Sequence, residues 1–521
     1  MLSNRLLASV YIAALFAGLA LLLFQANMLK GLNHDEHMYV AAGALLSREG
    51  LLPYRDFPYF QMPNLPFVYA GLFSTTSYLL LAARLFSTLC ALALCGVLFG
   101  AAWRAFRTRA LVARLLAGTG AVMLLVSNQT FVYASGLAWN HDLAALLGVL
   151  AFILFMRGAR LISWRWVTGA GVMLGLALGT RLTMGAMFVP LFIILLAMPG
   201  VSGAGARGRT LLHERLRLLA ALLGGTALAL APSIVLFALS PDRFLFSNIG
   251  YHALNEEYQI KAGYTRAVDA GGKLQYLVDV FTVPGTLALV ALVAVVAVPA
   301  LAKLPGLMGL YRFNVVAALL VALALLAGAL FTAPVWLQYF YVAVPFLILA
   351  CVYSVADVAP NRALSHATYA FSLLFLASIV WLGAGYYVGE GMLLYPGRWV
   401  PVRAHAVGEL LERSLRYRRV LTLSPIYALE AGFPIYPAFA SGPFAWRSGP
   451  LLTRQERAEF GIVAAPDLRE YVGARFPAFP AIVTGDEGLL EEPLVRYALA
   501  ERYGELRAPY GITLWAPLGG R

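Results

Sequence analysis

Charged residues are scarce in this chain. Asp, Glu, Lys and Arg make up only 12% of its 521 residues, whereas 61% of the residues are hydrophobic. A soluble globular protein carries about 25% charged residues, and a single buried core cannot hold so much apolar sequence. The composition therefore excludes an ordinary soluble domain and indicates a protein that spans a lipid bilayer.

Cysteine is also rare, and several other patterns are missing. Cys90, Cys95 and Cys351 all lie in apolar runs, so no disulfide framework is expected in the polar C-terminal region. The apolar runs lack the alternation of membrane β-barrel strands, and the chain has no internal repeat. The net charge of +13 comes largely from short loops, without a basic patch among exposed aromatics, so nucleic-acid binding has no support.

What the chain does have is a series of long apolar runs. The first, Leu6 to Leu29, is too long for a signal-peptide core and is predicted to be an uncleaved first span. Together the runs predict an α-helical polytopic membrane protein with about eleven transmembrane helices. They cover approximately residues 6–27, 79–103, 115–134, 142–156, 166–180, 185–199, 218–239, 277–302, 313–332, 336–356 and 367–388.

Short basic loops set the orientation of these spans. Positively charged loops face the cytoplasm, so the N-terminus is expected on that side. If the apolar segment 65–78 also crossed the membrane, the later basic loops would be inverted, so this segment is predicted to be an interfacial or re-entrant helix on the outer face. The basic loops are 104–114, 157–165 and 207–217, with weaker ones marked by Lys303, Arg312 and Arg362.

This topology divides the chain into two predicted domains. Residues 1–388 form a transmembrane module, whose first outer loop (28–78) carries the interfacial helices. Residues 389–521 have a soluble composition and are predicted to form a small α/β domain outside the membrane. Glu430 and Arg447 fall in a stretch of that domain rich in proline and aromatic residues, which we interpret as loop packing. Its strands are expected near 420–423, 481–484 and 512–515, and its helices near 403–415 and 491–503.

Ionisable side chains gather at the outer ends of the predicted spans, where they often mark functional sites. Asp35 and Glu36 follow the first span, Asp142 opens the fourth, and Arg181 follows the fifth. Each also has a structural interpretation, because acids cap helix starts and arginine anchors helix ends at the membrane surface. The loop charges, however, assign all of these residues to one face of the membrane. That convergence favours a functional site on the outer face.

Histidines and further charges share this face. Five of the seven histidines, at positions 34, 37, 141, 252 and 405, are predicted to lie outside. His34 and His37, with Asp35 and the pair His141-Asp142, can bind a divalent cation, although no standard metal-ligand spacing is present. The charges from Glu256 to Arg266 in the third outer loop are typical of a solvated loop surface.

Several of these features occur together in a known family. The acidic pair in Asp35-Glu36-His37-Met38-Tyr39 begins a helix, and Leu52-Pro53-Tyr54-Arg55-Asp56 leads to Gln61-Met62-Pro63-Asn64-Leu65. Asp142 and Gly175-Leu176-Ala177-Leu178-Gly179-Thr180-Arg181 follow in order, with Gln338-Tyr339-Phe340-Tyr341 later. In this ordered set the chain resembles the GT-C membrane glycosyltransferases, in particular the bacterial protein O-mannosyltransferases and the lipid A aminoarabinose transferase.

The resemblance implies an inverting glycosyltransferase that moves a hexosyl or pentosyl group from a polyprenyl-phosphate carrier to an acceptor on the outer face. Asp35 is then the expected base, with Glu36 and Asp142 orienting acceptor or sugar. Arg181 is the first candidate to bind the donor phosphate, and Lys261 and Arg266 are weaker candidates. Contacts to substrate or to a divalent cation are assigned to His34, His37, His141, Tyr54, Gln61 and His252.

The sequence departs from this family in one motif and leaves alternatives open. Gln61 and Met62 stand where the aminoarabinose transferases carry an acidic and a basic residue, so metal dependence and donor identity do not follow from the resemblance. The alternative functions are a transporter or flippase of lipid-linked or small substrates, an O-antigen polymerase or ligase, and a non-catalytic membrane scaffold. The expected partners are membrane lipid and a glycan, lipid or protein acceptor, and the expected location is the bacterial inner membrane, within the cell envelope.

Overall fold

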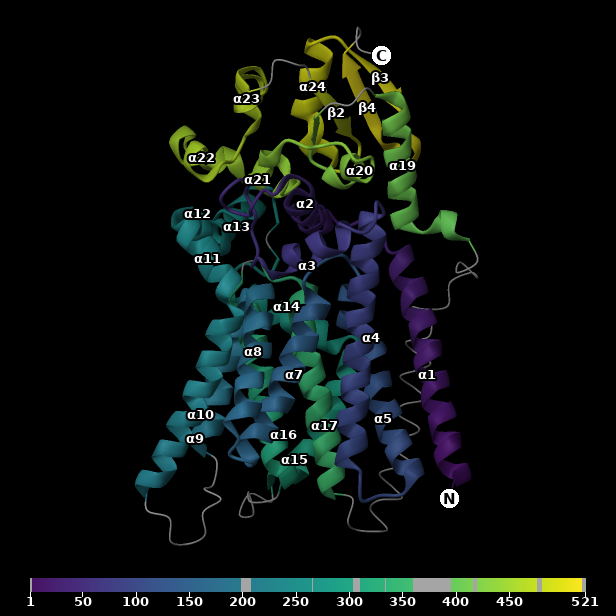
Figure 1. Ribbon diagram of the computed structural model, residues 1–521, viewed down its shortest axis with the longest axis vertical. Coiled ribbons are helices and arrows are strands. Elements are labelled where there is room, and N and C mark those ends of the chain that lie inside the picture. The colour runs from purple at the N-terminus through teal and green to yellow at the C-terminus, as the bar shows by residue number, and fades with distance from the viewer. Residues whose placement is uncertain are drawn as a thin grey trace.

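The computed structural model is mostly helical and is described for residues 2–197, 208–264, 266–302, 310–332, 334–358, 395–415, 419–475 and 480–517. Long helices run side by side in a bundle, and a small β-sheet lies at one end of it (Figure 1). The N-terminus is at the opposite end from the sheet, and the C-terminus lies beside the sheet. The bundle and the sheet-bearing end therefore form two layers along the long axis.

Five helical stretches of the described chain are long and apolar enough to cross a membrane, and two bent pairs raise this number to seven if each pair is one span. The five are α1 (Leu2–Leu29), α4 (Leu79–Ala105), α7 (His141–Arg160), α16 (Leu310–Leu330) and the continuous stretch of η4 (Leu337–Ala343) and α17 (Val344–Val358). The bent pairs are α10 (Gly208–Ala229) with α11 (Ala231–Leu239), and α14 (Ala270–Thr282) with α15 (Pro284–Ala302).

Other predicted spans are shorter or interrupted. The segment predicted as one helix over 277–302 is instead broken by a bend of 89° between α14 and α15. Proline opens α15, and the preceding residue Val283 is extended, as the proline ring requires. The remaining bundle helices are α5 (Leu111–Val126), α8 (Trp164–Thr180), η1 (Leu182–Met187) and α9 (Phe188–Ala197). The last predicted span, 367–388, and the basic markers Lys303 and Arg362 lie outside the described residues.

Short helices fill the space between the bundle and the sheet (Figure 1). One of them, α3 (Asn64–Phe73), has 10 residues, so it is about 15 Å long and too short to cross a hydrocarbon core of about 30 Å. The helix is thus not a span of its own, and its predicted position at the outer membrane surface stays a prediction. The others are α2 (His34–Glu49), α6 (Gln129–Ala134), α12 (Pro241–Leu245), the π-helix η2 (Phe246–Gly250) and α13 (Tyr251–Lys261).

The C-terminal segment carries a four-stranded sheet with the order β1-β2-β4-β3. Strand β1 pairs parallel to β2, and β4 pairs antiparallel to both β2 and β3. Three strands occupy the predicted positions, while β3 was not predicted because its exposed, charged sequence lacks apolar alternation. The elements are α19 (Val400–Ser414), β1 (Val420–Thr422), α20 (Pro425–Glu430), α21 (Pro443–Ser448), α22 (Arg454–Phe460), α23 (Leu468–Arg475), β2 (Ala481–Thr484), α24 (Glu492–Ala500), β3 (Tyr503–Arg507) and β4 (Thr513–Pro517).

The C-terminal segment is packed directly onto the membrane module. Ile426 and Ala428 of α20 belong to the same continuous apolar core as Ala41 of α2. The buried carboxylate of Glu430 accepts a hydrogen bond of 2.8 Å from the backbone N–H of Leu80, at the start of α4, which has no side-chain cap of its own. This contact satisfies one of the unpaired N–H groups of the helix end. Glu430 is therefore more than loop packing, because it fixes the segment to a bundle helix.

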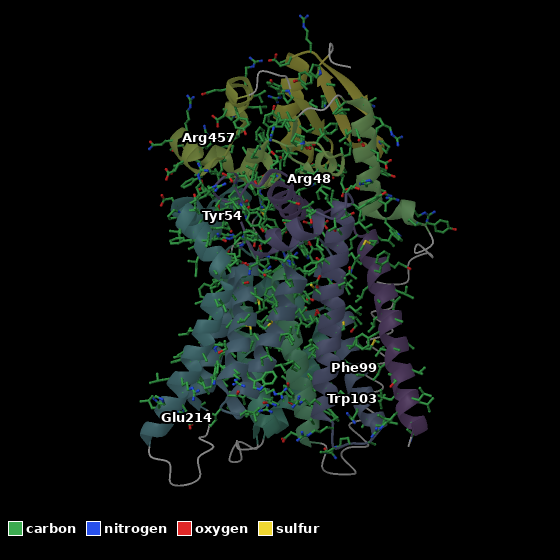
Figure 2. The ribbon with its side chains drawn as sticks, in the orientation of Figure 1. Arg48, Tyr54, Phe99, Trp103, Glu214 and Arg457 are labelled. Atoms are coloured by element: carbon green, nitrogen blue, oxygen red, sulfur yellow. The ribbon has the colours of Figure 1, made fainter. Side chains whose placement is uncertain are left out.

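Figure 2 shows which of the labelled residues lie at each end of the molecule. Arg48, Tyr54 and Arg457 lie toward the sheet-bearing end, and Phe99, Trp103 and Glu214 lie at the opposite end of the bundle. The guanidinium of Arg48 donates a hydrogen bond of 2.7 Å to the carbonyl of Leu429, which adds a polar contact between α2 and the C-terminal segment. The polar chemistry described below lies at this junction.

Candidate active site

Helix α2 begins with a capping box that fixes its first turn. The side-chain oxygen of Asn33 accepts a hydrogen bond of 2.9 Å from the N–H of Asp35, and a carboxylate oxygen of Glu36 accepts one of 3.0 Å from the N–H of Asn33. Both bonds satisfy donors at the helix N-terminus, where the helix dipole also stabilises negative charge. The sequence Asn-His-Asp-Glu therefore places two adjacent carboxylates on a rigid helix start.

The two carboxylates have different surroundings. Glu36 is completely buried and forms a bidentate ion pair with Arg84 of α4, with N–O distances of 2.8 and 2.6 Å. It also accepts a hydrogen bond of 2.7 Å from the N–H of Ala138. With the bond from Asn33, four donors hold this carboxylate in place. Glu36, predicted to orient substrate, thus joins α2, α4 and the 135–140 loop and does not line the cavity described next.

A cavity of about 300 Å³ opens beside Asp35, between the first turn of α2, helix α13 and the C-terminal segment. Four of the sequence-predicted site residues line it: His34, Asp35, Gln61 and His252. Its wall also contains aromatic rings, among them Tyr39, Phe60, Tyr251, Trp336, Tyr339 and Phe444. Mixed aromatic and convergent polar linings are typical of small-ligand sites.

Asp35 presents the open carboxylate of this cavity. Its side chain is 24% exposed, and the Nε2 atom of His34 lies 3.4 Å from one of its carboxylate oxygens. No hydrogen bond to the carboxylate of Asp35 exists within the part of the chain that the structure describes. His252 faces the same cavity, and burial lowers the pKa of its imidazole, which keeps it neutral at physiological pH. Asp35 can therefore accept a proton from a bound group.

Arg181 lies next to the cavity at the end of α8. Its guanidinium donates to Oγ1 of Thr183 at 3.0 Å and to Nε2 of His141 at 2.8 Å, and it lies over the ring of Tyr339, 4.9 Å from the centroid. The side chain is buried, yet no carboxylate of the described residues pairs with it. A buried guanidinium with only neutral partners is well suited to receive an anion.

The end of α8 is shaped by two asparagines. Asn64 donates a hydrogen bond of 3.2 Å to the carbonyl of Leu176, and Asn140 donates one of 3.1 Å to the carbonyl of Thr180. A Cβ atom at Gly179 would lie 2.4 Å from the amide nitrogen of Asn64, so only glycine allows this close approach. The sequence Gly-Thr-Arg therefore ends the helix against α3 and places Arg181 over Tyr339, next to the cavity.

Arg447 is a site residue that the sequence interpretation missed. It comes from α21 of the C-terminal segment and lines the cavity with Phe444. Its guanidinium donates a hydrogen bond of 2.7 Å to the side chain of Asn255 and lies 4.5 Å from the ring centroid of Phe444. No carboxylate pairs with it among the described residues, and its Nε atom has no hydrogen-bond partner there. The only sequence signal was a lone cation in an aromatic-rich stretch.

Asp142 and His141 lie deeper than predicted. The buried carboxylate of Asp142 accepts hydrogen bonds from the N–H of Gly136 at 2.7 Å and from the hydroxyl of Tyr341 at 2.8 Å. These bonds fasten the 135–140 loop and the η4 segment to the start of α7. His141 contacts Arg181, and neither it nor Asp142 lines the cavity.

Two of the predicted contact residues form packing contacts outside the cavity. The hydroxyl of Tyr54 donates to the carbonyl of Gln61, within the loop between α2 and α3. The ring of His37 accepts a hydrogen bond of 3.5 Å from the N–H of Ile426 at Nδ1, so its Nε2–H donates to Asp486 at 3.0 Å. His37 therefore connects α2 to the C-terminal segment.

The two weaker phosphate-binding candidates lie on the surface and are already paired. The Nζ atom of Lys261 lies 2.7 Å from Glu257, and Arg266 lies 2.7 Å from Asp279. Both cationic side chains are 61% exposed, and neither lines the cavity. Such exposed pairs contribute little energy and do not form a phosphate site at the cavity.

A metal site does not fit the residues around the cavity. No group of three His, Cys, Asp or Glu side chains within the described ranges is arranged to hold a metal ion. His34 and Asp35 are close to each other, but the other predicted ligands point into separate contacts: His37 to Asp486 and His141 to Arg181. The reaction proposed for this site therefore assigns no role to a metal ion.

Comparison with known proteins identifies the fold. No protein-family model and no curated protein sequence matches this chain. The structure of ArnT from Cupriavidus metallidurans in the apo state has a TM-score of 0.61 at 13% identity, with 98% of both chains covered. ArnT bound to undecaprenyl phosphate has a TM-score of 0.59 at 14% identity, covering 97% of this chain and 98% of that chain.

A more distant likeness extends to the archaea. The Archaeoglobus fulgidus oligosaccharyltransferase in complex with Zn and sulfate has a TM-score of 0.50 at 13% identity, covering 97% of this chain and 74% of that chain. The same oligosaccharyltransferase, tethered with an acceptor peptide, has an equal score and covers 98% of this chain. The resemblance that the sequence motifs indicated is confirmed by the structure: this chain has the GT-C fold of membrane glycosyltransferases.

Proposed function

We propose that this protein transfers a sugar from a polyprenyl-phosphate-linked donor to an acceptor on the outer face of the membrane. The observation that carries this proposal is the composition of one cavity. Asp35 supplies an open carboxylate there and Arg447 supplies a cation, while Arg181 lies next to the cavity over the ring of Tyr339; neither arginine has a carboxylate partner among the described residues. A carboxylate base opposite anion-binding groups is what transfer from a phosphate leaving group requires.

The residues have separate roles in this reaction. The carboxylate of Asp35 takes the proton of the acceptor hydroxyl as its oxygen forms a bond to the anomeric carbon of the donor sugar. The bond between that carbon and the phosphate oxygen breaks, and its electron pair leaves with the lipid phosphate. Arg181, on the bundle side of the cavity, stabilises the charge on this phosphate with its planar guanidinium. Attack opposite to the leaving group inverts the anomeric carbon.

Arg447 lines the cavity from the C-terminal segment, whereas Arg181 lies next to the cavity at the end of α8. Arg447 closes the site over the donor with Phe444, whose ring offers an apolar face to a sugar. Glu36 and Asp142 hold the backbone around the site through their buried hydrogen bonds, so their contribution to the reaction is to position Asp35 and the 135–140 loop.

The proposal includes the membrane topology that hydropathy and loop charge predict. We propose about eleven spans with a cytoplasmic N-terminus, a transmembrane module over residues 1–388 and an extracytoplasmic α/β domain over 389–521. The placement of Glu214 at the bundle end opposite the sheet supports this orientation, because the basic loop 207–217 is predicted to be cytoplasmic (Figure 2). The expected location is a bacterial inner membrane.

The proposal is tested with the full chain in lipid nanodiscs and a set of radiolabelled polyprenyl-phosphate sugars. Release of the labelled sugar is measured for the wild type, for Asp35→Asn and for Glu257→Gln, which changes an exposed acid outside the cavity. The expected result is turnover that Asp35→Asn lowers by about 10²–10⁴-fold and Glu257→Gln leaves unchanged. Equal turnover in Asp35→Asn would place the base elsewhere. If the folded protein releases no sugar from any donor, transport or a scaffold role replaces the enzyme.

A further inference from the structure

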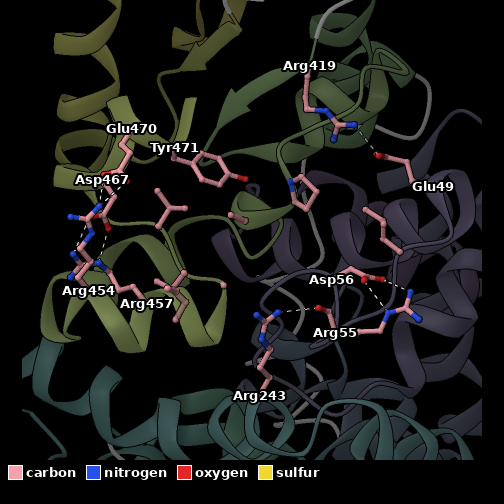
Figure 3. A pocket seen from close by; sticks show the side chains of 17 residues that line it. Glu49, Arg55, Asp56, Arg243, Arg419, Arg454, Arg457, Asp467, Glu470 and Tyr471 are labelled. Atoms are coloured by element: carbon pink, nitrogen blue, oxygen red, sulfur yellow. Dashed lines mark hydrogen bonds and ion pairs between the residues drawn. The ribbon is translucent and has the colours of Figure 1, made fainter. Parts of the chain in front are cut away.

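A second and larger cleft lies beside the proposed active site. It has a volume of about 730 Å³ and is bounded by the end of α2 and the loop after it, by α12, and by α22 and α23 of the C-terminal segment (Figure 3). Tyr471 contributes an aromatic ring to its wall, beside apolar groups such as Leu51 and Val463. No residue of this cleft takes part in the proposed transfer reaction.

The charges of the cleft are nearly balanced. Five arginines and four carboxylates line it, and every carboxylate is paired with an arginine (Figure 3). Arg243 is held by two backbone carbonyls, those of Glu459 at 2.6 Å and Arg55 at 2.9 Å. The four pairs are Arg55 with Asp56 at 2.7 Å, Arg419 with Glu49 at 3.2 Å, Arg454 with Glu470 at 2.7 Å, and Arg457 with Asp467 at 2.6 Å.

The guanidinium donors of the cleft lie beside carboxylate acceptors, and this arrangement favours one chemical class of ligand. A polyanion would have to displace several carboxylates from their arginines, and a polycation would have to displace the arginines. A hydroxyl group, in contrast, both donates and accepts, so it can bridge a guanidinium and a carboxylate without breaking their pair. The apolar faces of sugar rings can also pack against Tyr471. The lining therefore fits an uncharged, hydroxyl-rich glycan.

The cleft and the active-site cavity are built from the same three segments. In the first outer loop Arg55 lines the cleft and Gln61 lines the cavity. In the α12–α13 region Arg243 lines the cleft and Tyr251 the cavity, and in the C-terminal segment Arg457 and Arg447 do the same. The same three segments thus contribute residues to both hollows.

Two aromatic stacks hold together the segments that line the two hollows. Phe60, which lines the cavity, stacks on Tyr251 with ring centroids 3.8 Å apart. Phe246 of η2 stacks on Phe460 with centroids 3.9 Å apart, directly before Gly461 of the cleft. The length of helix α2 gives the distance between the cavity and the cleft. Asp35 of the cavity lies at its start and Glu49 of the cleft at its end, which corresponds to about 21 Å of helix at 1.5 Å per residue.

We propose that this cleft binds the non-reacting part of the acceptor, and that this part is a neutral oligosaccharide long enough to extend about 21 Å to Asp35. The identification of the bound glycan as the acceptor rests on the proposed function. Glycan binding in the cleft does not rest on the proposed function, because it requires neither Asp35 nor a donor. The cleft would thereby select acceptors by length and hydroxyl pattern before the reacting hydroxyl reaches the cavity.

The test measures binding of short neutral glucan, mannan and galactan oligosaccharides, and of the same oligosaccharides bearing phosphate, to the full chain in nanodiscs. Tyr471→Ala removes the ring, and the double change Arg454→Ala with Glu470→Ala removes one pair whose side chains are 75% and 65% exposed, so the fold should persist. A matched control, Arg496→Ala with Glu492→Ala, removes an exposed pair of the same segment outside the cleft.

A neutral oligosaccharide is expected to bind the wild type, the control and Asp35→Asn equally, and to bind both cleft variants at least about tenfold more weakly. Binding only of the phosphorylated forms, binding that the cleft variants leave unchanged, or no binding of any oligosaccharide would each overturn the inference. If the wild type releases no sugar from any donor while the cleft variants lose glycan binding, the proposed function fails and the glycan cleft stands. If the wild type releases sugar while the cleft variants bind glycan as the wild type does, the cleft proposal fails and the proposed function stands.

Discussion

Glu36 and Arg84 form a fully buried bidentate ion pair one residue away from the open carboxylate of Asp35. The pair connects the first outer loop to α4, while the capping box connects Glu36 to Asn33. Asp35 is thus held by the helix start and by its neighbour's contacts, and its own side chain stays directed to the cavity. Of these two adjacent carboxylates, Glu36 stabilises the fold and Asp35 is available to react.

Changing Glu36 should lower stability more than it changes chemistry. Glu36→Gln leaves the guanidinium of Arg84 buried without its counter-charge, which costs about 3–5 kcal/mol. We expect a lower midpoint of thermal unfolding in detergent, measured beside Asp35→Asn, which should unfold close to the wild-type temperature. A Glu36→Gln protein that is as stable as the wild type would contradict the role of this pair.

Arg181 should be required for donor turnover in a way that the surface cations are not. Arg181→Lys keeps the charge but loses the planar fork, so we expect kcat/KM for the donor to fall by about 10²-fold. Lys261→Ala and Arg266→Ala are the matched comparison, since both cations are exposed and paired, and they should change kcat/KM by less than about twofold. Equal losses in all three variants would remove Arg181 from the phosphate site.

Arg447 should make the C-terminal segment necessary for transfer. Arg447→Met removes the cation while keeping a long side chain over Phe444, and we expect at least about a tenfold loss of turnover with little change in unfolding temperature. Arg496→Met, on the exposed surface of α24, serves as the control. Unchanged turnover in Arg447→Met would mean that the segment only packs against the cavity.

The contact between the C-terminal segment and α4 should weaken as pH rises. The hydrogen bond of 2.6 Å that Nδ1–H of His405 donates to the carboxylate of Glu430 raises the pKa of His405, with further contributions from Glu409 and Glu412. Burial raises the pKa of Glu430 as well, although His405, the N–H of Leu80 and the nearby Arg48 oppose this shift. Both folded-state pKa values therefore lie above those of the unfolded chain.

The sign of the effect follows from these directions. The contribution of His405 is complete below its unfolded pKa of about 6.5 and is lost as pH rises through the raised folded value, and a buried Glu430 with a raised pKa changes stability in the same direction. We expect the unfolding temperature of the wild type to fall from about pH 6.5 upward and the slope to flatten in His405→Gln. An identical slope in both proteins would assign the pH dependence to other groups.

Local patterns were enough to predict much of the bundle. Apolar runs and arginine-rich loops are properties of short windows, so α1, α4, α7 and α16 begin and end close to their predicted positions. The broken helix at Val283–Pro284 was missed because its apolar composition continues across the bend. Strand β3 was missed for the opposite reason, since its residues are exposed and charged.

The gathering of Asp35, His34, Gln61 and His252 around one cavity agrees with the single outer face that loop charge predicted. The role of each acid did not follow from the sequence. Whether an acid is buried depends on partners far along the chain: Glu36 meets Arg84, which is 48 residues away, and Asp142 meets Tyr341, which is 199 residues away.

By itself, the sequence determined that this chain crosses a membrane repeatedly and presents a cluster of ionisable residues on one side, because hydropathy and charge act locally on each segment. Three features depended on the tertiary structure alone. They are the carboxylate that stays open, the position of Arg447 of the C-terminal segment at the cavity, and the cleft lined by arginine–carboxylate pairs. These outcomes depend on contacts between distant residues, whose energies are set by burial and by the partners that folding supplies.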